Sequence, residues 1–348
     1  MEAEKNLKKN TIFSAKSILK VSDDIPLIGH IAFGIIDRGT NLLQLRPSSL
    51  CPLSCIFCSV DAGPKSRFRK TEFIVDLDYM LEYVKIIAEY KAVKDLQIHI
   101  DAAGDPLTYP RIVDLIFCLS ELKNIKVISL ETHGALLNYK LLDEMDEAGL
   151  SRLNLSIDTL DPQLAKYLSG SKWFDLPKVL EFAEYIAENL KMDLLIAPVW
   201  IPGVNDEDMP RIIKFAKKIG AGKKWPPLGI QKYEVHRYGR KPKGVKPMTW
   251  YKFYQTLKKW EKAYNVKLVL NPRDFGIYKV KPLPLIFKKG QKISAKVIGW
   301  GWHKNEWLGV AKDRIVAIIG AKGEPPVGSK VKVEIVRNKN NIYVGVLG

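Results

Sequence analysis

Three of the four cysteines, Cys51, Cys55 and Cys58, lie within eight residues in the order C-x3-C-x2-C. A disulfide framework would spread its cysteines along a small secreted chain. A zinc site would need a fourth Cys or His. His30 is the only histidine before residue 60, and its spacing from the three cysteines is not typical of a zinc site. Three thiolates suit an iron–sulfur cluster that leaves one iron open. The isolated Cys118 lies in an apolar stretch, which favours a place in the core.

Further polar residues follow apolar, strand-like runs. The segments concerned are Ala103-Gly104-Asp105-Pro106 and Glu131-Thr132-His133-Gly134. A histidine in a turn is more often structural than catalytic, so we assign His133 no acid–base role. In α/β barrels the chemistry lies at the carboxyl ends of the strands, which is where these segments fall.

A later run carries polar residues at alternate positions, Asn154, Ser156 and Asp158, which therefore share one strand face. Either a ligand or mutual hydrogen bonding would satisfy them. Gly203 and Asn205 belong to a turn before Asp206, and a plain turn with an aspartate N-cap is the simpler interpretation of that segment.

These residues need a scaffold of alternating strands and helices. A hairpin is expected over residues 27–46, around the turn Asp37-Arg38-Gly39. Strands then follow at 96–100, 126–130, 152–157, 193–199 and 229–235, and helices at 77–90, 111–122, 141–148, 162–168, 176–190, 206–219 and 250–264. The order predicts an α/β fold with a parallel sheet and right-handed crossovers, forming a partial (β/α)6 barrel.

The pattern changes after about residue 270. We divide the chain into an N-terminal extension and hairpin (1–40), the α/β core (41–271), a proline-rich linker (272–285) and a C-terminal domain (286–348). Short alternating runs in the last segment, at 293–298, 306–311, 314–319, 330–336 and 341–347, predict a small all-β barrel of the oligonucleotide-binding (OB) kind.

The charge balance favours a polyanionic partner. The chain of 348 residues has 55 Lys+Arg and 38 Asp+Glu, a net charge of +17, and 47% hydrophobic residues, which excludes a mostly disordered protein. Residues 222–247 hold eight Lys/Arg and one acid, and residues 285–348 hold twelve and four. Candidates for stacking on RNA bases or pairing with phosphates are Tyr233, Arg237, Arg240, Lys241, Trp300, Trp302, Lys332 and Arg337. A solvated charged surface is the alternative.

No apolar run approaches the roughly 18 residues of a membrane span. Residues 1–10 are charged and lack the apolar stretch of a signal peptide. We therefore expect a cytoplasmic protein without a membrane partner.

The cysteine motif, with an aromatic residue before its third Cys, resembles the signature of radical S-adenosylmethionine (SAM) enzymes, and the likeness extends over residues 41–271. The resemblance implies a [4Fe–4S] cluster on Cys51, Cys55 and Cys58, whose open iron binds SAM and cleaves it to a 5′-deoxyadenosyl radical. It also implies SAM contacts from Ala103, Gly104, Asp105, Glu131, Thr132, Ser156, Asp158, Gly203 and Asn205. Ala103 and Asp105 depart from the family's Gly-Gly-Glu-Pro segment, so only a backbone role carries over there.

Residues 286–348 resemble a TRAM domain, a small β-barrel found on several RNA-modifying enzymes. Together the two resemblances indicate an archaeal iron–sulfur oxidoreductase group. They favour a radical SAM enzyme that modifies tRNA or rRNA and takes electrons from a ferredoxin or flavodoxin. A peptide or small-metabolite substrate is the first alternative, and a nucleic-acid-binding iron–sulfur protein without turnover is the second. The catalytic residues stay unassigned.

Overall fold

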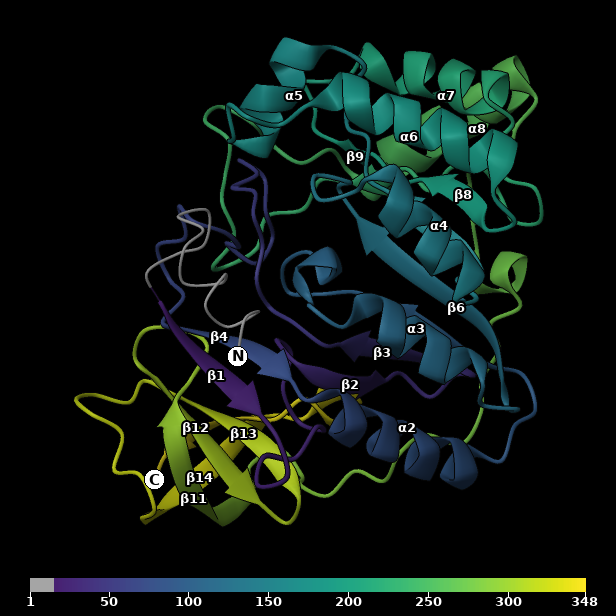
Figure 1. The fold of residues 1–348 in the computed structure, drawn as a ribbon. Helices are drawn as coiled ribbons and strands as arrows, with labels where there is room; N and C mark the ends of the chain where they lie inside the picture. The colour runs from purple at the N-terminus through teal and green to yellow at the C-terminus, as the bar shows by residue number, and fades with distance from the viewer. Residues whose placement is uncertain (1–15) are drawn as a thin grey trace.

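The computed structural model describes residues 16–348, so the prediction about a signal peptide in residues 1–10 lies outside the described residues. An α/β core occupies most of the chain, and a small β-barrel from its last sixty residues packs at one side of it (Figure 1). Among residues 16–348 we find no helix with the length and apolar character needed to cross a membrane.

The core is built on one six-stranded sheet in the order β2-β3-β5-β6-β7-β8. The predicted hairpin is confirmed: β2 (Gly34–Asp37) runs antiparallel to β3 (Leu42–Arg46). From β3 the sheet continues in parallel through the remaining strands, β5 (Leu96–Ile100), β6 (Ile125–Thr132), β7 (Arg152–Leu155) and β8 (Asp193–Ile196). Their carboxyl ends meet at one edge of the sheet.

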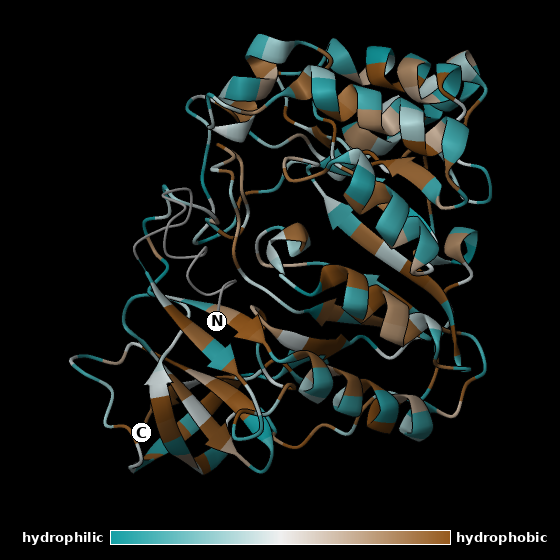
Figure 2. Ribbon diagram, viewed as in Figure 1, coloured by the Kyte–Doolittle hydropathy of each residue, from teal (hydrophilic) through white to brown (hydrophobic). Residues whose placement is uncertain are grey.

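Helices connect these strands and cover one side of the sheet (Figure 1). They are α2 (Leu77–Lys91), α3 (Ile112–Ser120), α4 (Tyr139–Glu147), α5 (Pro162–Ser169), α6 (Leu176–Asn189), α7 (Asp208–Lys218) and α8 (Trp250–Tyr264). Side chains of Asp76, Asn138 and Asp161 accept hydrogen bonds from the first-turn amides of α2, α4 and α5, which explains where these helices begin. Apolar faces turn toward the sheet and polar faces turn outward (Figure 2).

The sixth parallel strand is shorter than predicted. β10 (Gln231–Lys232) has two residues and pairs in parallel with β9 (Val199–Trp200) in a separate ladder. A bridge between Ile196 and Leu228 connects this region to β8. Pro226 and Pro227 stand just before it and cannot donate to a ladder, so strand pairing begins late.

One strand pair was not predicted. β1 (Ser17–Val21) runs parallel to β4 (Thr71–Val75), just beyond the cysteine segment. Phe73 and Val75 of β4 are fully buried, so this pair closes the core on the side of the C-terminal barrel. Cys118 packs half-buried against the core, consistent with the place that we predicted for it.

The C-terminal segment forms a closed five-stranded barrel in the order β11-β12-β13-β15-β14, as the all-β prediction required. Its strands are β11 (Lys292–Trp300), β12 (Glu306–Ala311), β13 (Arg314–Ile319), β14 (Lys330–Arg337) and β15 (Val344–Leu347). The barrel has a small core of its own around Phe287, Val297 and Tyr343.

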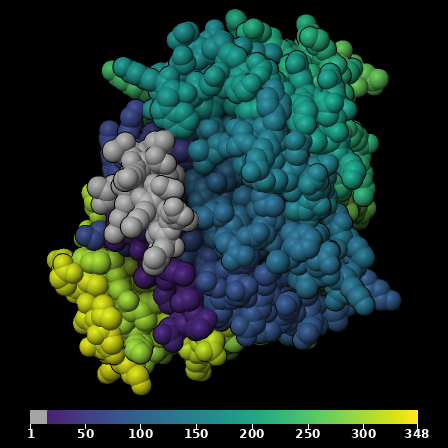
Figure 3. Space-filling model, viewed as in Figure 1, coloured from purple at the N-terminus to yellow at the C-terminus, as the bar shows by residue number. Residues whose placement is uncertain are grey.

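The barrel is also joined to the α/β core along a seam. The amides of Ile315 and Tyr343 donate to the carbonyls of Ile28 and Gly29, at 2.9 Å each. Gly29 has φ of 130°, and a Cβ there would collide with the backbone of Ile315, so this close approach requires glycine. The space-filling view shows the barrel in direct contact with the N-terminal part of the chain (Figure 3).

The linker 272–285 begins with the short helix η2 (Pro272–Phe275) and then crosses the core without regular structure. Side chains of the core hold it: Asn41 accepts from the Tyr278 amide, and Asp37 accepts from the Leu283 amide. The linker is therefore bound to the core along its length and is not a free connection between two domains.

Candidate active site at the carboxyl ends of the strands

The three clustered cysteines lie on the loop that follows β3. Cys51 and Cys55 are buried, and Cys58 is half-buried. The amides of Ser54 and Ile56 donate to the carbonyls of Ser169 and Leu168 at the end of α5, which fixes the path of the loop. The Ala62 amide donates to the Cys58 sulfur at 3.2 Å, which positions this side chain in the loop.

Arg240 braces this loop from the opposite side. Its guanidinium donates to the carbonyls of Cys55 and Ala62, at 2.6 Å each, and pairs with Asp61 at 2.8 Å. Its own amide donates to the Cys58 carbonyl. We predicted Arg240 as an RNA ligand, and the structure corrects this: its guanidinium is occupied in shaping the cysteine loop.

Burial raises the pKa of the Cys51 thiol far above its usual range, and the Asp105 carboxylate adds to this effect. Burial and then the neighbouring Cys51 and Cys58 raise the pKa of Cys55. The thiols of Cys51 and Cys55 therefore stay protonated unless a cation binds them, and a metal cluster that binds there would release their protons. Within residues 16–348 no three Cys, His, Asp or Glu side chains are close enough together to surround a single metal ion. In an iron–sulfur cluster the thiolates can bind different irons.

The segment after β5 lies beside the cysteine loop. The Asp105 amide donates to the Leu50 carbonyl at 2.8 Å, and a Cβ on Gly104 would collide with that same carbonyl. Glycine at this position lets two backbone segments touch, so Ala103 and Gly104 come next to Cys51. The backbone contact with SAM that we predicted for these residues stays a prediction.

Asp105 and Thr132 use their side chains on each other. The Thr132 hydroxyl lies 2.8 and 2.9 Å from the two Asp105 oxygens, and the amides of Leu107 and His133 also donate to Asp105. Burial raises the pKa of this carboxyl, although His133 and the hydrogen bonds oppose the shift. The predicted SAM contacts of Asp105 and Thr132 are therefore not side-chain contacts, because both side chains hold the ends of β5 and β6 together.

A cavity of about 370 Å³ opens over the thiols, and we call it the cluster pocket. The predicted residues that line it are Cys51, Cys55, Cys58, Gly104, Glu131, Ser156, Tyr233 and Arg240. Tyr233 is 2% exposed and its hydroxyl has no hydrogen-bond partner among residues 16–348. The prediction that Tyr233 stacks on RNA at the surface is corrected, because this buried residue lines the cluster pocket.

The predicted face of β7 is confirmed only in part. Ser156 lines the cluster pocket. Asp158 does not line it and accepts a hydrogen bond from the Val199 amide. Asn205 donates to the carbonyls of Asp158 and Val199 and accepts from Ile201, so its amide is fully used in shaping the loop after β9. Gly203 and Asn205 do not line the cluster pocket, and a structural role accounts for both.

Of two histidines at the site, His133 was given no acid–base role from the sequence, and His99 was not singled out. His133 lies 3.9 Å from both the Cys55 sulfur and an Asp158 oxygen. His99 on β5 faces Glu131 at 3.5 Å and Ser129 at 2.9 Å in a neighbouring inner cavity of about 270 Å³, which Asn154 also lines. Burial would raise the pKa of Glu131, but the hydrogen bond and charge of His99 outweigh it and lower the pKa. The signal for His99 was present: Gln97 and His99 alternate with apolar residues along β5, so they share one face of the strand.

The remaining RNA candidates separate into exposed and buried positions. Arg237, Lys241, Lys332 and Arg337 are exposed, as predicted. Trp300 is half-buried with the Lys70 ammonium 4.7 Å from its ring centroid. Trp302 is 3% exposed, and the prediction of a base-stacking surface loop is corrected because its ring packs under the Arg69 guanidinium, 4.8 Å away.

Arg69 itself was not singled out by the sequence, yet it connects the barrel to the site. It is fully buried and donates to the carbonyls of Ser49, Val60 and Ala103, the first two flanking the cysteines. Its ion pair with Glu72, at 3.0 Å, compensates the charge. Trp302 from the barrel therefore rests on the residue that joins the cysteine loop to the loop after β5.

Residues 45–216 match the family model described as the radical SAM superfamily. An uncharacterized protein of Methanocaldococcus jannaschii is 44% identical over 358 aligned positions, which cover 97% of this chain and 82% of that protein. The chain belongs to the radical SAM superfamily. Members use a [4Fe–4S] cluster and SAM, and this radical SAM enzyme does so too.

Other relatives share only the core. The GTP 3′,8-cyclase of Syntrophomonas wolfei is 29% identical over 185 residues, and that of Peptoclostridium acidaminophilum is 31% identical over 173. The chain spans about half the length of each, 53% and 50%. Streptococcus suis SuiB, solved with its precursor peptide SuiA, is 19% identical with a TM-score of 0.50, covering 65% of this chain and 47% of that one. This likeness shows the shared fold.

The residues present fit both cofactors. Cys51, Cys55 and Cys58 would hold the cluster, since two buried thiols and one half-buried thiol on the same loop suit its irons. Gly104, Ser156 and the unpartnered Tyr233 hydroxyl offer polar contacts to SAM across the cluster pocket. When bound, the reduced cluster supplies the electron that cleaves SAM to methionine and a 5′-deoxyadenosyl radical.

Proposed function

We propose that this radical SAM enzyme modifies RNA, tRNA or rRNA, at the cluster pocket. One observation carries the proposal: a basic groove of about 480 Å³ beside the cysteine loop. Its cationic and aromatic residues are Arg67, Phe68, Tyr167, Arg237, Arg240, Lys241 and Lys243. Asp61 is the one acid among the described residues that line it, and this carboxylate is buried against Arg240.

The chemistry of this basic groove suits a single strand of RNA. Tyr167 and Phe68 are 56% and 40% exposed, so both rings can stack on bases. Arg237, Lys241 and Lys243 stand free to pair with phosphates. Arg240 lines both the basic groove and the cluster pocket, so the two are adjacent. An RNA strand in the basic groove would therefore pass beside the radical source.

The chain's own residues have three tasks in this scheme. Arg240 and Arg69 hold the cysteine loop in shape through its carbonyls. Ser156 and Tyr233 orient a ligand in the cluster pocket. The walls of Phe57, Val60 and Val199 keep water from the reacting atoms. A ferredoxin or flavodoxin would deliver the electron, and we place this work in the cytoplasm as part of the proposal.

A small metabolite or a peptide is the alternative substrate. The GTP 3′,8-cyclase relatives favour a nucleotide such as GTP, whose phosphates could use the same cations. A nucleic-acid-binding iron–sulfur protein without turnover is the third hypothesis. It predicts that the reconstituted chain forms no 5′-deoxyadenosine.

Mass spectrometry of nucleosides from the RNA of a deletion strain separates these proposals. We expect one modified nucleoside to disappear and to return when the wild-type gene, but not a Cys55→Ala gene, is restored. An unchanged nucleoside profile, together with 5′-deoxyadenosine formation that GTP or a peptide stimulates and RNA does not, would overturn the RNA proposal in favour of a smaller substrate.

A further inference from the structure

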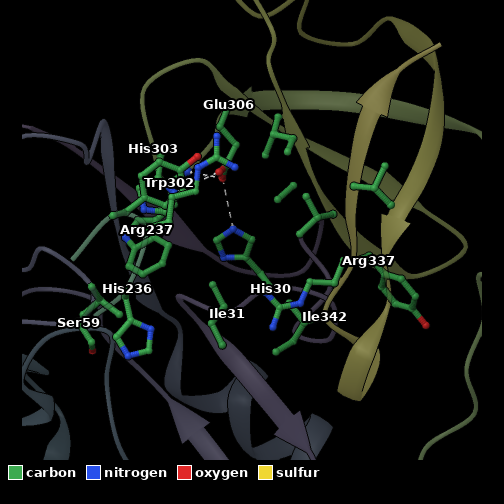
Figure 4. A pocket seen from close by; sticks show the side chains of 17 residues that line it. His30, Ile31, Ser59, His236, Arg237, Trp302, His303, Glu306, Arg337 and Ile342 are labelled. Atoms are coloured by element: carbon green, nitrogen blue, oxygen red, sulfur yellow. Dashed lines mark hydrogen bonds and ion pairs between the residues drawn. The ribbon is translucent and has the colours of Figure 1, made fainter. Parts of the chain in front are cut away.

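A second cavity lies in the seam between the α/β core and the barrel. It has a volume of about 440 Å³, within the range of small-ligand sites, and we call it the seam pocket. His30, Ile31 and Val60 contribute from the core, and the barrel contributes Trp302, Glu306 and Arg337 (Figure 4). Neither domain forms this cavity alone.

The seam pocket adjoins the other two cavities of the site, because it shares lining residues with each. Ser59, Val60 and His236 line both the seam pocket and the cluster pocket. Arg237 lines both the seam pocket and the basic groove. A ligand in the seam pocket therefore sits next to the third cysteine of the cluster loop.

The free charge of the seam pocket is positive. Glu306 is the one acid among the described residues of its lining, and it is already bound: His303 Nδ1 lies 3.2 Å and His30 Nε2 3.6 Å from its oxygens. Arg237 and Arg337 form no salt bridge within residues 16–348. Figure 4 shows Arg237 beside Trp302 and His303, and Arg337 beside Ile342. The two guanidiniums thus flank the cavity and suit phosphates.

The walls of the seam pocket are otherwise apolar and aromatic. The apolar lining residues include Ile31, Ala317, Ile319 and Val344. Two buried atoms of its lining residues, Trp302 Nε1 and His303 Nε2, have no hydrogen-bond partner in the described part of the chain. Trp302 Nε1 is a donor, and His303 Nε2 is a second polar atom on the adjacent ring. The two ring centroids lie 4.5 Å apart, so both atoms can hydrogen-bond to the polar edge of one nucleobase.

We propose that the seam pocket binds one unpaired nucleotide of the RNA, with its base against the apolar wall and its flanking phosphates on Arg237 and Arg337. The inference rests on the proposed RNA function and deepens it, because it assigns the barrel a direct share in substrate binding. The nucleotide anchors the strand beside the cluster loop while a neighbouring nucleotide enters the cluster pocket. Both atoms named above are covered in this conformation, and the half-buried Tyr238 ring, stacked on His303 at 4.4 Å, must shift for the base to reach them.

The test compares two charge-matched double variants of the reconstituted full chain: Arg237→Gln with Arg337→Gln, and Lys292→Gln with Lys322→Gln on the barrel outside the pocket. A labelled single-stranded RNA of about 12 nucleotides is the probe, since binding sites of this kind span roughly 4–16 nucleotides. We expect the arginine pair to weaken binding about tenfold or more, and to lower the slope of log affinity against log salt by about 1.4, or 0.7 for each phosphate contact. We expect the lysine pair to change both much less.

Photo-crosslinking of the same RNA containing 4-thiouridine should give adducts on peptides with Tyr238, Trp302 or His303. Equal losses in the two double variants, or adducts confined to other peptides, would overturn the seam-pocket proposal while RNA binding itself stands. A wild-type chain that binds no RNA would instead overturn the proposed function and this inference with it. If the arginine pair weakened the competition of inorganic phosphate with RNA but left RNA binding itself unchanged, the seam pocket would be a simple anion site. That result would also overturn the inference.

Discussion

At the scale of single residues, we expect different results from replacing Cys55 and from replacing Cys118. Cys55→Ala leaves two thiolates for a cluster that already has an open iron, so we expect loss of the brown colour and of bound iron after anaerobic reconstitution. Cys118 packs half-buried in α3, away from the site, and Cys118→Ala should retain the cluster. Iron analysis of the two variants checks the ligand assignment, and loss of iron in Cys118→Ala would contradict it.

Arg240 gives a second prediction at this scale. Arg240→Met keeps the length of the side chain and removes three donors that hold the Cys55 and Ala62 carbonyls and Asp61. We expect cluster content to fall several-fold, because the loop loses its shape, while the neighbouring exposed Arg237→Gln keeps full content. Iron per chain and the visible absorption spectrum measure this. Equal cluster content in both variants would show that the brace is not needed.

At the scale of elements, the loop between β11 and β12 depends on Glu306. This carboxylate accepts from the Trp302 amide at 2.9 Å and from His303, and it faces His30. Burial alone would raise the pKa of Glu306, but hydrogen bonds from His30 and His303 outweigh it and lower the pKa to about 2. A lowered pKa in the folded state adds stability above the unfolded value near 4.5, and this stability is lost as the pH falls toward 2.

Glu306→Gln should therefore lower the free energy of unfolding by about 3 kcal/mol at pH 7. The difference from wild type should persist down to about pH 4.5 and then shrink with further acidification. Urea unfolding at several pH values measures it. A difference that stays constant through pH 3 would mean that the charge of Glu306 does not stabilise the seam.

Local signals in the sequence predicted most elements. The hairpin of β2 and β3 has a turn within its own segment, and β5 was predicted at its observed bounds because its apolar run is short and clearly ended. The pair of β1 and β4 joins segments that are far apart in the sequence, and neither segment contains a pattern that identifies the other as its partner. For the same reason the burial of Trp302 was missed, since its partner Arg69 lies on the other domain.

The site was predicted to a similar extent. Cysteine spacing identified the cluster loop, and alternation identified Ser156. Neither could show that Arg240 and Asn205 use their side chains on nearby backbone, because a basic or amide residue in a loop has the same sequence signature whether it binds a ligand or a carbonyl.

At the scale of the whole molecule, the barrel is part of the core's packing. Trp302, Leu308 and Ile315 of the barrel are buried within the core's own apolar cluster. A chain that ends at residue 285 would remove Trp302 from beside His30, where the ring centroids lie 6.3 Å apart, and would leave Arg69 without its aromatic cover. We expect this truncated chain to unfold at a clearly lower urea concentration, or to aggregate. An unfolding midpoint equal to that of the full chain would show that the core is independent of the barrel.

The most direct test of radical SAM chemistry at this site is the release of 5′-deoxyadenosine from SAM by the anaerobically reconstituted full chain, with dithionite as reductant. We expect the wild-type chain to form 5′-deoxyadenosine and methionine in equal amounts, and the Cys55→Ala chain to form neither. If the wild-type chain held about four irons and formed no 5′-deoxyadenosine, or if Cys55→Ala formed as much as wild type, the assignment of this loop as the radical-generating centre would be contradicted.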